Sequence, residues 1–185
     1  MNAYYLPETI SVGGQHYTMR TDFRAVLDVL IACNDPELGD AEKSAVMLEI
    51  MLPEWQTIPQ ELLQEALQKL AQFIDCGHKD DGKQSPRVVD WEQDAEIIVA
   101  AVNSVAHTEI RAVPKLHWWT FMSYFMEIRE SLFSNVIAIR QKKARRKNLE
   151  KWEQDFYKEN REMIDLHQAE TDEIRAEKEN MLKYL

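Results

Sequence analysis

Glycine, proline and cysteine are all scarce in this chain, which has 5, 6 and 2 of them in 185 residues. Sandwiches and barrels need many tight turns, so the shortage of glycine favours long helices over those folds. The two cysteines, Cys33 and Cys76, cannot form a disulfide framework and fit a reducing compartment. These scarcities predict a mainly α-helical protein, about the size of one ordinary domain with an appendage.

The chain also lacks a long apolar run and an excess of positive charge. Its most apolar windows, AVLDVLIAC and EIIVAAV, are much shorter than the about 20 residues that cross a bilayer. The first residues, MNAYYLPETI, have neither the basic start nor the apolar stretch of an export signal. The formal net charge of −10 disfavours a sequence-independent nucleic-acid binder, because phosphate backbones attract basic surfaces. We therefore expect a soluble protein with no membrane contact that works inside a cell.

Motifs for catalysis and for phosphate binding are missing as well. The sequence contains no glycine-rich phosphate loop, no G-x-S-x-G elbow and no H-E-x-x-H motif. Cys76 and His78 could supply two zinc ligands, but a structural zinc site needs four, and Cys33 lies in an apolar helical stripe. We therefore expect no catalytic residue, no metal site and no cofactor.

Four acidic residues cluster in the segment DWEQDAEI: Asp90, Glu92, Asp94 and Glu96. A calcium-binding EF-hand loop would need glycine where Ala95 stands, so that motif fails. Acidic residues in the first turn of a helix are expected, because they oppose the positive end of its dipole. The cluster is interpreted as the start of a helix.

Alternating apolar residues around a glycine pair predict a β-hairpin at the N-terminus. In ETISVGGQHYTMR, Ile10 and Val12 alternate before Gly13-Gly14, and Tyr17 and Met19 alternate after it. Paired glycines provide the positive φ angles that a two-residue turn requires. A single hairpin is marginal in water, so it must pack on the helices that follow.

The remainder of the chain carries apolar residues at helical spacing between start and stop signals. The predicted helical segments are 21–36, 39–54, 58–77, one that opens at Asp90 and runs to 106, and 114–147. The last of these reads as one broken helix or two short ones, with a restart at Ser131 or Ser134. No internal repeat is apparent.

The segment KLHWWTFMSYF places large aromatic rings three and four residues apart. Trp118, Phe121, Met122 and Phe125 share one face of a helix. Stacking on nucleic-acid bases would need these rings in a positively charged groove, and the neighbouring residues are nearly neutral. His117 has no second ligand at helical spacing. The rings are therefore interpreted as core.

The C-terminal part is built of charge blocks. Residues 140–151 contain seven basic residues and one acidic residue, residues 153–179 contain ten acidic and four basic residues, and residues 1–139 hold 10 basic against 21 acidic. From about Asn148 the chain has no glycine or proline and reads as one long helix. We expect a compact domain over 1–147 and a charged helical arm over 148–185. The last twenty residues are equally compatible with helix and disorder.

An apolar seam on this arm must be covered by something, which predicts partner docking or self-association through the arm. The predicted partner-binding residues are Arg140, Lys142, Lys143, Arg145, Arg146, Lys147, Leu149, Trp152, Phe156, Met163 and Leu166. An alternative is a regulatory protein that binds nucleic acid through the basic segment 140–151, although the acidic remainder makes nucleic acid an unfavourable partner.

Five segments together resemble the bacteriophage gene-product-fifteen family, small proteins encoded near the tape-measure gene of long-tailed phages. The resemblance covers residues 6–140. The segments are RTDFR (20–24), DPELGDAEKSAVMLE (35–49), ALQKLAQFIDCG (66–77), VDWEQDAEIIVAAV (89–102) and LHWWTF (116–121). The last, with its His-Trp-Trp core, is the most distinctive.

The resemblance implies a role in tail morphogenesis within the cytoplasm of the host bacterium. Such proteins are similar to tail-assembly chaperones, which bind the tape-measure protein and recruit tail-tube subunits. No catalytic residue is implied, so the expected protein is not an enzyme. The motif residues are expected to determine the fold: Arg20, Asp22, Phe23, Asp94, His117, Trp118 and Trp119.

Overall fold

The computed structural model describes residues 4–78 and 86–167, and these ranges are mainly helical. A two-stranded hairpin, β1 (Thr9–Val12) and β2 (Gln15–Thr18), precedes the helices. The α-helices are α1 (Phe23–Asn34), α2 (Asp40–Met51), α3 (Leu63–Ile74), α4 (Ala95–Ala106), α5 (Trp118–Met126), α6 (Leu132–Ala144), α7 (Lys151–Glu159) and α8 (Arg161–Ile164). Single 3-10 turns are η1 (Trp55–Thr57), η2 (Gln60–Leu62) and η3 (Ile110–Ala112). The predicted mainly α fold with an N-terminal hairpin is confirmed.

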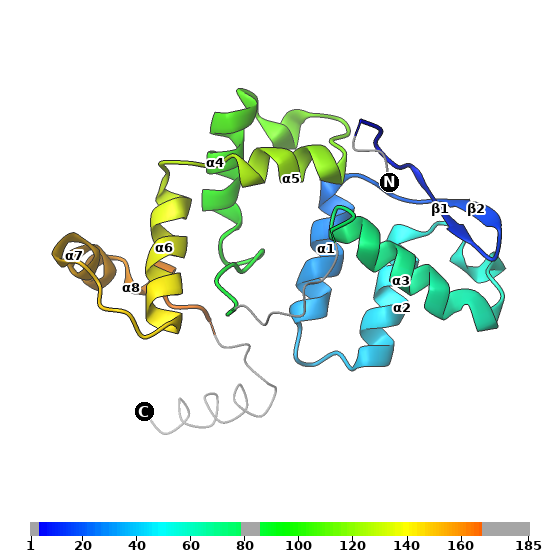
Figure 1. The fold of residues 1–185 in the computed structure, drawn as a ribbon, viewed down its shortest axis with the longest axis horizontal. Coiled ribbons are helices and arrows are strands. Elements are labelled where there is room, and N and C mark those ends of the chain that lie inside the picture. Colours follow the sequence, from blue (N-terminus) through cyan, green and yellow to red (C-terminus); the bar gives the residue numbers. More distant parts are fainter. Residues whose placement is uncertain (1–3, 79–85, 168–185) are drawn as a thin grey trace, which may run out of the picture.

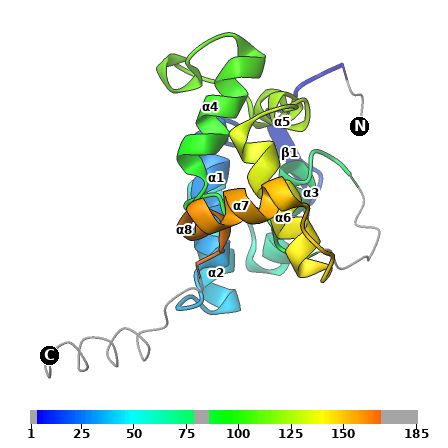
Figure 2. The ribbon, with the colours of Figure 1, turned by 90° about the vertical axis from the view of Figure 1, so that its left-hand side faces the viewer.

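The helices form a two-ended arrangement. The hairpin, α2 and α3 lie at one end of the molecule, whereas α6, α7 and α8 lie at the other, with α4 and α5 between them (Figure 1). Viewed from the α7 end, α7 runs across α6 (Figure 2). Within the described residues, no helix is both long and apolar enough to span a bilayer.

The hairpin forms where the glycine pair predicted it. The strands pair antiparallel, with Ile10 opposite Tyr17. Gly13 and Gly14 have φ angles of +56° and +81°, a region that glycine adopts without the strain of a side chain. Ile10, Val12 and Tyr17 are buried, which anchors the hairpin to the helices, with β1 lying on α3.

Two family-motif residues, Asp22 and His117, join the start of α1 to the start of α5. They form an isolated antiparallel β-bridge, in which the Phe23 N–H donates to the Leu116 carbonyl at 2.9 Å. The Asp22 carboxylate accepts from the Arg24 N–H and, 94 residues further along the chain, from the Leu116 N–H. Each of the two residues is the N-cap of its helix, so a residue that marks a helix start locally also contacts a segment distant in sequence.

The aromatic segment forms the centre of the core, as predicted. Phe23 and Phe121 stack at 4.8 Å, and Trp118 stacks on Phe121 at 5.5 Å. The indole N–H of Trp118 donates to the Ile74 carbonyl, and that of Trp119 donates to the Phe73 carbonyl. Carbonyls at a helix C-terminus have no intrahelical partner, so the two indoles both fill the core and cap α3.

The predicted start of the fourth helix at Asp90 is wrong, since α4 begins at Ala95. The Asp90 carboxylate accepts from the backbone N–H groups of Glu92 and Gln93, and the Asp94 carboxylate accepts from the Asp90 N–H. Short acidic side chains that bond nearby N–H groups favour a turn over a helix. The break at 127–131 agrees with the prediction, and Ser131 is the N-cap of α6.

The expectation of one long helix from Asn148 is also wrong for the described residues. The chain leaves α6, turns, and forms the two short helices α7 and α8, separated at Asn160. Both lie beside α6, and α7 crosses it (Figures 1 and 2). Packing on α6 favours two short helices over one long helix, because a short helix gains most of its stability from burial of its apolar face. Residues 168–185, where helix or disorder was predicted, lie outside the described residues.

Candidate partner-binding surface around helix α6

Arg140 sits at the centre of the contacts between α4, α6 and α8. Its guanidinium makes two hydrogen bonds to the Asp94 carboxylate, at 2.6 and 2.9 Å. The side chains of Arg140 and Asp94 are only 4% and 1% exposed. Since Arg140 is buried in this pair, it does not belong to the exposed surface on which the sequence placed it. Asp94 holds the fold together, in keeping with its place in the family motif.

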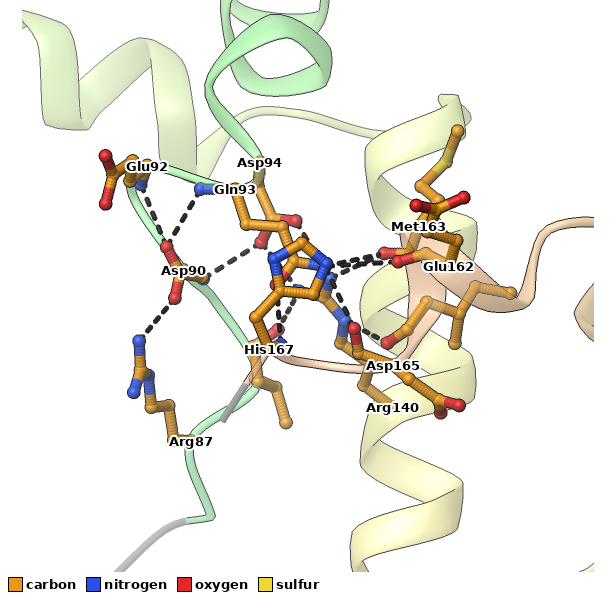
Figure 3. A network of polar contacts seen from close by, with 12 residues as sticks. Arg87, Asp90, Glu92, Gln93, Asp94, Arg140, Glu162, Met163, Asp165 and His167 are labelled. Atoms are coloured by element: carbon orange, nitrogen blue, oxygen red, sulfur yellow. Dashed lines mark hydrogen bonds and ion pairs between the residues drawn. The ribbon is translucent and has the colours of Figure 1, made fainter. Parts of the chain in front are cut away.

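The same guanidinium also binds backbone carbonyls on two sides. It donates to the Val88 carbonyl at 2.9 Å, to the Met163 carbonyl at 2.8 Å and to the Ile164 carbonyl at 2.7 Å. The side-chain amide N–H groups of Gln93 also donate to the carbonyls of Glu162, Met163 and Asp165, as Figure 3 shows. These carbonyls lie at the C-terminal end of α8. The Arg140 and Gln93 side chains therefore bind that end in place of intrahelical partners.

Lys142 and Lys143, two further predicted partner-binding residues, form ion pairs inside the molecule. The Lys142 ammonium lies 2.7 Å from the Glu153 carboxylate. The Lys143 ammonium pairs with Asp165 and lies 3.7 Å from the centre of the Tyr157 ring. Two of the five basic residues at 142–147 are thus already neutralised.

These ion pairs shift the pKa of the carboxyl groups. Burial raises the pKa of Glu153, but hydrogen bonds from Lys142 and from the Glu150 N–H outweigh it, so the net pKa lies below the usual value. Burial likewise raises the pKa of Asp165, and bonds from Lys143, Tyr157 and Arg161 turn the net shift downward. Both carboxylates therefore stay charged to a lower pH than in an unfolded chain.

The apolar seam of the predicted arm is largely covered by the protein itself. Val136, Ile139 and Ile164 form a small buried cluster, separate from the main core. Leu149, Phe156 and Met163 pack against it and are half-buried, and Leu166 is also half-buried. Trp152 differs, because it is 49% exposed and its indole N–H donates to Glu150 at 3.0 Å.

Arg145, Arg146 and Lys147 lie in the turn after α6 and are exposed. None of the three forms an ion pair with a described residue. Arg146 has a φ of +52°, and the Lys147 N–H donates back to the Lys142 carbonyl at 2.8 Å, which closes the end of α6. Of the predicted partner-binding residues, these three and Trp152 are the ones the structure leaves on the surface.

Sequence reasoning missed Gln93, Glu153, Ile164 and Asp165. Their signal was weak: the apolar seam was drawn for one continuous helix and passed through Met163 and Leu166 but not Ile164, and Asn160, at which that helix breaks, was overlooked. Gln93 binds carbonyls about 70 residues away, a contact that no local pattern encodes.

A cleft of about 530 Å³ lies beside this network. Its walls include Asn34, Asp35 and Glu37 from the end of α1, together with Asp90 and Glu92 before α4. Arg87 lines it too, but its guanidinium is paired with Asp90 at 2.5 Å. Among the described residues, no group of three or more histidine, cysteine, aspartate or glutamate side chains could hold a metal ion.

The remaining motif residues are distributed over the core and its edge. Phe23, His117 and Trp118 are buried, and Trp119 is half-buried. The His117 Nδ1 accepts from the Trp119 N–H at 3.1 Å, so its Nε2 carries the proton that is donated to the Pro7 carbonyl at 3.0 Å. Arg20 is exposed and is held by its backbone N–H, which donates to the Met51 carbonyl.

The hairpin, the bridge of Asp22 to His117 and the tryptophan helix bring the motif segments together in one fold. The chain belongs to the Bacteriophage Gp15 protein family, whose family model matches residues 4–166. The match continues past residue 140, where the resemblance ended, and includes α7 and α8. No match was found among curated proteins or among solved structures.

Proposed function

We propose that this Gp15-family protein is a non-enzymatic tail assembly factor that binds the tape-measure protein, the tail-tube protein or both through helical contacts. Family membership supports a phage role. The tail-assembly role follows from the resemblance of the motif segments to chaperone-like proteins encoded beside the tape-measure gene.

One structural observation supports binding to a protein partner. Arg145, Arg146 and Lys147 are exposed and unpaired within the described residues, and they precede the half-exposed indole of Trp152 by a few residues. Arginine and tryptophan are enriched among residues that dominate binding energy at interfaces. We name Arg145, Arg146, Lys147 and Trp152 the basic corner.

The basic corner is unusual because the preceding chain is strongly acidic, with 10 basic against 21 acidic residues over 1–139. A basic surface on an acidic protein selects and orients an acidic partner segment and disfavours other orientations. The partner segment that fits is an amphipathic helix with acidic residues beside one large apolar residue, which would cover the indole.

The experiment is co-purification of the full chain with tape-measure and tail-tube proteins encoded beside it, followed by titration. The double variant Arg145→Glu/Lys147→Glu should weaken binding and reduce its dependence on salt, because rim charges act through electrostatic steering. Trp152→Ala should weaken binding about tenfold or more, as for an interface aromatic anchor.

Matched controls separate the basic corner from general charge and apolar effects. Lys69→Glu/Arg129→Glu makes the same charge change at two exposed residues elsewhere, and Met126→Ala removes another exposed apolar side chain. Both controls should bind as the unchanged protein does. If the Arg145→Glu/Lys147→Glu variant bound as tightly as the unchanged protein, the basic corner would not be the binding surface. A gel shift at low salt that this variant abolishes would favour the nucleic-acid alternative instead.

A further inference from the structure

Arg140 on α6 and Gln93, just before α4, form a binding site for the C-terminal end of a helix. We call this site the α4–α6 receptor. The hydrogen bonds that Arg140 and Gln93 donate to α8 and to the residue after it all go to main-chain carbonyls. In return, the Gln93 side-chain oxygen accepts from the His167 N–H at 2.9 Å. Figure 3 shows these donors converging on residues 162–167 from two different elements.

Arg140 also has partners that do not belong to the C-terminal segment. Its bonds to Asp94 and to the Val88 carbonyl involve residues that precede α4. Its bonds to the Met163 and Ile164 carbonyls involve the C-terminal segment alone. Departure of that segment would therefore leave the buried ion pair in place and free two donors for another helix end.

Besides these hydrogen bonds and the ion pair of Lys142 with Glu153, residues 149–167 are held by a small apolar cluster and one exposed ion pair. The apolar part is the small cluster around Val136, Ile139 and Ile164, which is separate from the main core. The ion pair of Lys143 with Asp165 is accessible to water, since these side chains are 34% and 40% exposed. Pairs of this exposure add little stability and are screened by salt.

The turn that leads into this segment is strained. Residues 145–150 belong to no helix, and Arg146 holds a φ of +52°. A long side chain at this φ is disfavoured, and glycine is the residue that usually occupies it. This φ belongs to the turn that ends α6, in which the N–H groups of Arg146 and Lys147 donate to the carbonyls of Lys143 and Lys142. A connector in which α6 continued as a helix would not require it.

We propose that the α4–α6 receptor takes residues 149–167 from a second copy of the chain, so that two copies exchange this segment. Each exchanged contact repeats one that the single chain already makes, because every copy carries both the receptor and the segment that fits it. Such exchange of identical elements is a low-cost route to a dimer. Opening of the connector relieves the Arg146 backbone, and a second copy, unlike a different protein, always carries a segment that makes these same contacts.

Charge reversal across the pair of Lys143 and Asp165 tests this exchange in the full chain. Lys143→Glu alone places two acidic residues together, and Asp165→Lys alone places two basic residues together. An exchanged mixed dimer of the two variants has an opposite-charge pair at both receptors. Native mass spectrometry of the mixture, with one variant labelled with ¹⁵N, should show the mixed dimer exceeding either homodimer by about tenfold.

Three controls make the outcome decisive. The double variant Lys143→Glu/Asp165→Lys restores the pair within one chain and should behave as the unchanged protein does. Arg146→Gly removes the strain and should lower the dimer fraction, whereas Arg146→Pro cannot adopt the positive φ and should raise it. A mixture that stays monomeric, or dimers in statistical proportion, would overturn the proposal. No tail protein is used, so this result is independent of the proposed function.

Discussion

Arg140 and Asp94, 46 residues apart, form a bidentate ion pair that is almost inaccessible to water and joins α6 to the start of α4. A buried pair of this kind gives little net stability compared with apolar residues, but loss of one partner leaves a buried charge without compensation. Loss of either partner should therefore weaken the attachment of α6 to the start of α4.

The first prediction concerns this pair. Arg140→Met should lower the free energy of unfolding by about 3–5 kcal/mol, because it leaves the Asp94 carboxylate buried and unpaired. Urea denaturation measures the change. Arg145→Met, which alters an exposed arginine with no ion pair in the described part of the chain, should stay within about 0.5 kcal/mol of the unchanged protein. The double variant Arg140→Met/Asp94→Leu should be more stable than Arg140→Met alone, and a less stable double variant would contradict this account.

The second prediction concerns the ring of His117, which caps α5 and holds the N-terminal segment through Pro7. His117→Ala removes both contacts and should cost about 1–2 kcal/mol through the lost cap alone. His117→Asn keeps an acceptor for the Trp119 N–H, so its stability should lie between those of His117→Ala and the unchanged protein. Thermal unfolding at constant pH ranks the three. An asparagine variant no better than the alanine variant would show that the cap contributes nothing.

The third prediction is a loss of attachment of α7 and α8 in acid. Folding lowers the pKa of Glu153 and Asp165, so the stability they contribute is complete above the unfolded carboxyl pKa of about 4 and is lost as the pH falls through the lower folded pKa. Protection of the backbone amides of residues 151–164 against hydrogen exchange, relative to the intrinsic rate at each pH, should therefore fall below pH 4 before protection in α1 does.

A matched variant isolates the carboxyl groups in this experiment. Glu153→Gln/Asp165→Asn removes both titrating groups, so the amides of α7 and α8 should be less protected at neutral pH, and their protection should change little on acidification. If this variant showed the same acid transition as the unchanged protein, other groups would be responsible for it.

The fourth prediction concerns the thiols. Burial, with a smaller contribution from the charge of Asp75, raises the pKa of Cys76 to about 11. Burial also raises the pKa of Cys33. Since the thiolate is the reactive form, iodoacetamide should modify both thiols slowly at pH 8 in the folded protein and at the ordinary rate in urea. The variant Cys76→Ser reports Cys33 alone. Rapid modification of folded Cys76 at pH 8 would contradict the burial.

The hairpin, the aromatic core and several helix starts could be predicted, because their signals are local. The glycine pair at 13–14 set the hairpin turn, and Ser131 set the start of α6. Aromatic spacing placed Trp118 and Phe121 in the core. The start of α4 could not be predicted to the residue, since Asp90 and Asp94 serve equally as acids in a first helical turn and as acceptors in the turn before it.

The surface around α6 was predicted less well. Charge and periodicity marked residues 140–166 as a segment that must contact something, and the basic corner lies within it. The same pattern did not separate Arg140, Lys142 and Lys143, which bind inside the molecule, from Arg145, Arg146 and Lys147, which face solvent. Seven basic residues in twelve look alike until the carboxylates that neutralise them are placed.

The sequence by itself determined the helical class, the hairpin and the aromatic centre, because periodicity, capping residues and glycine pairs act over a few residues. The tertiary structure alone decided where the C-terminal segment goes. Its path depends on the Asp94 carboxylate and the Gln93 amide, which lie about 70 residues before the carbonyls of α8. Burial next to those groups breaks a helix that local propensity would have continued.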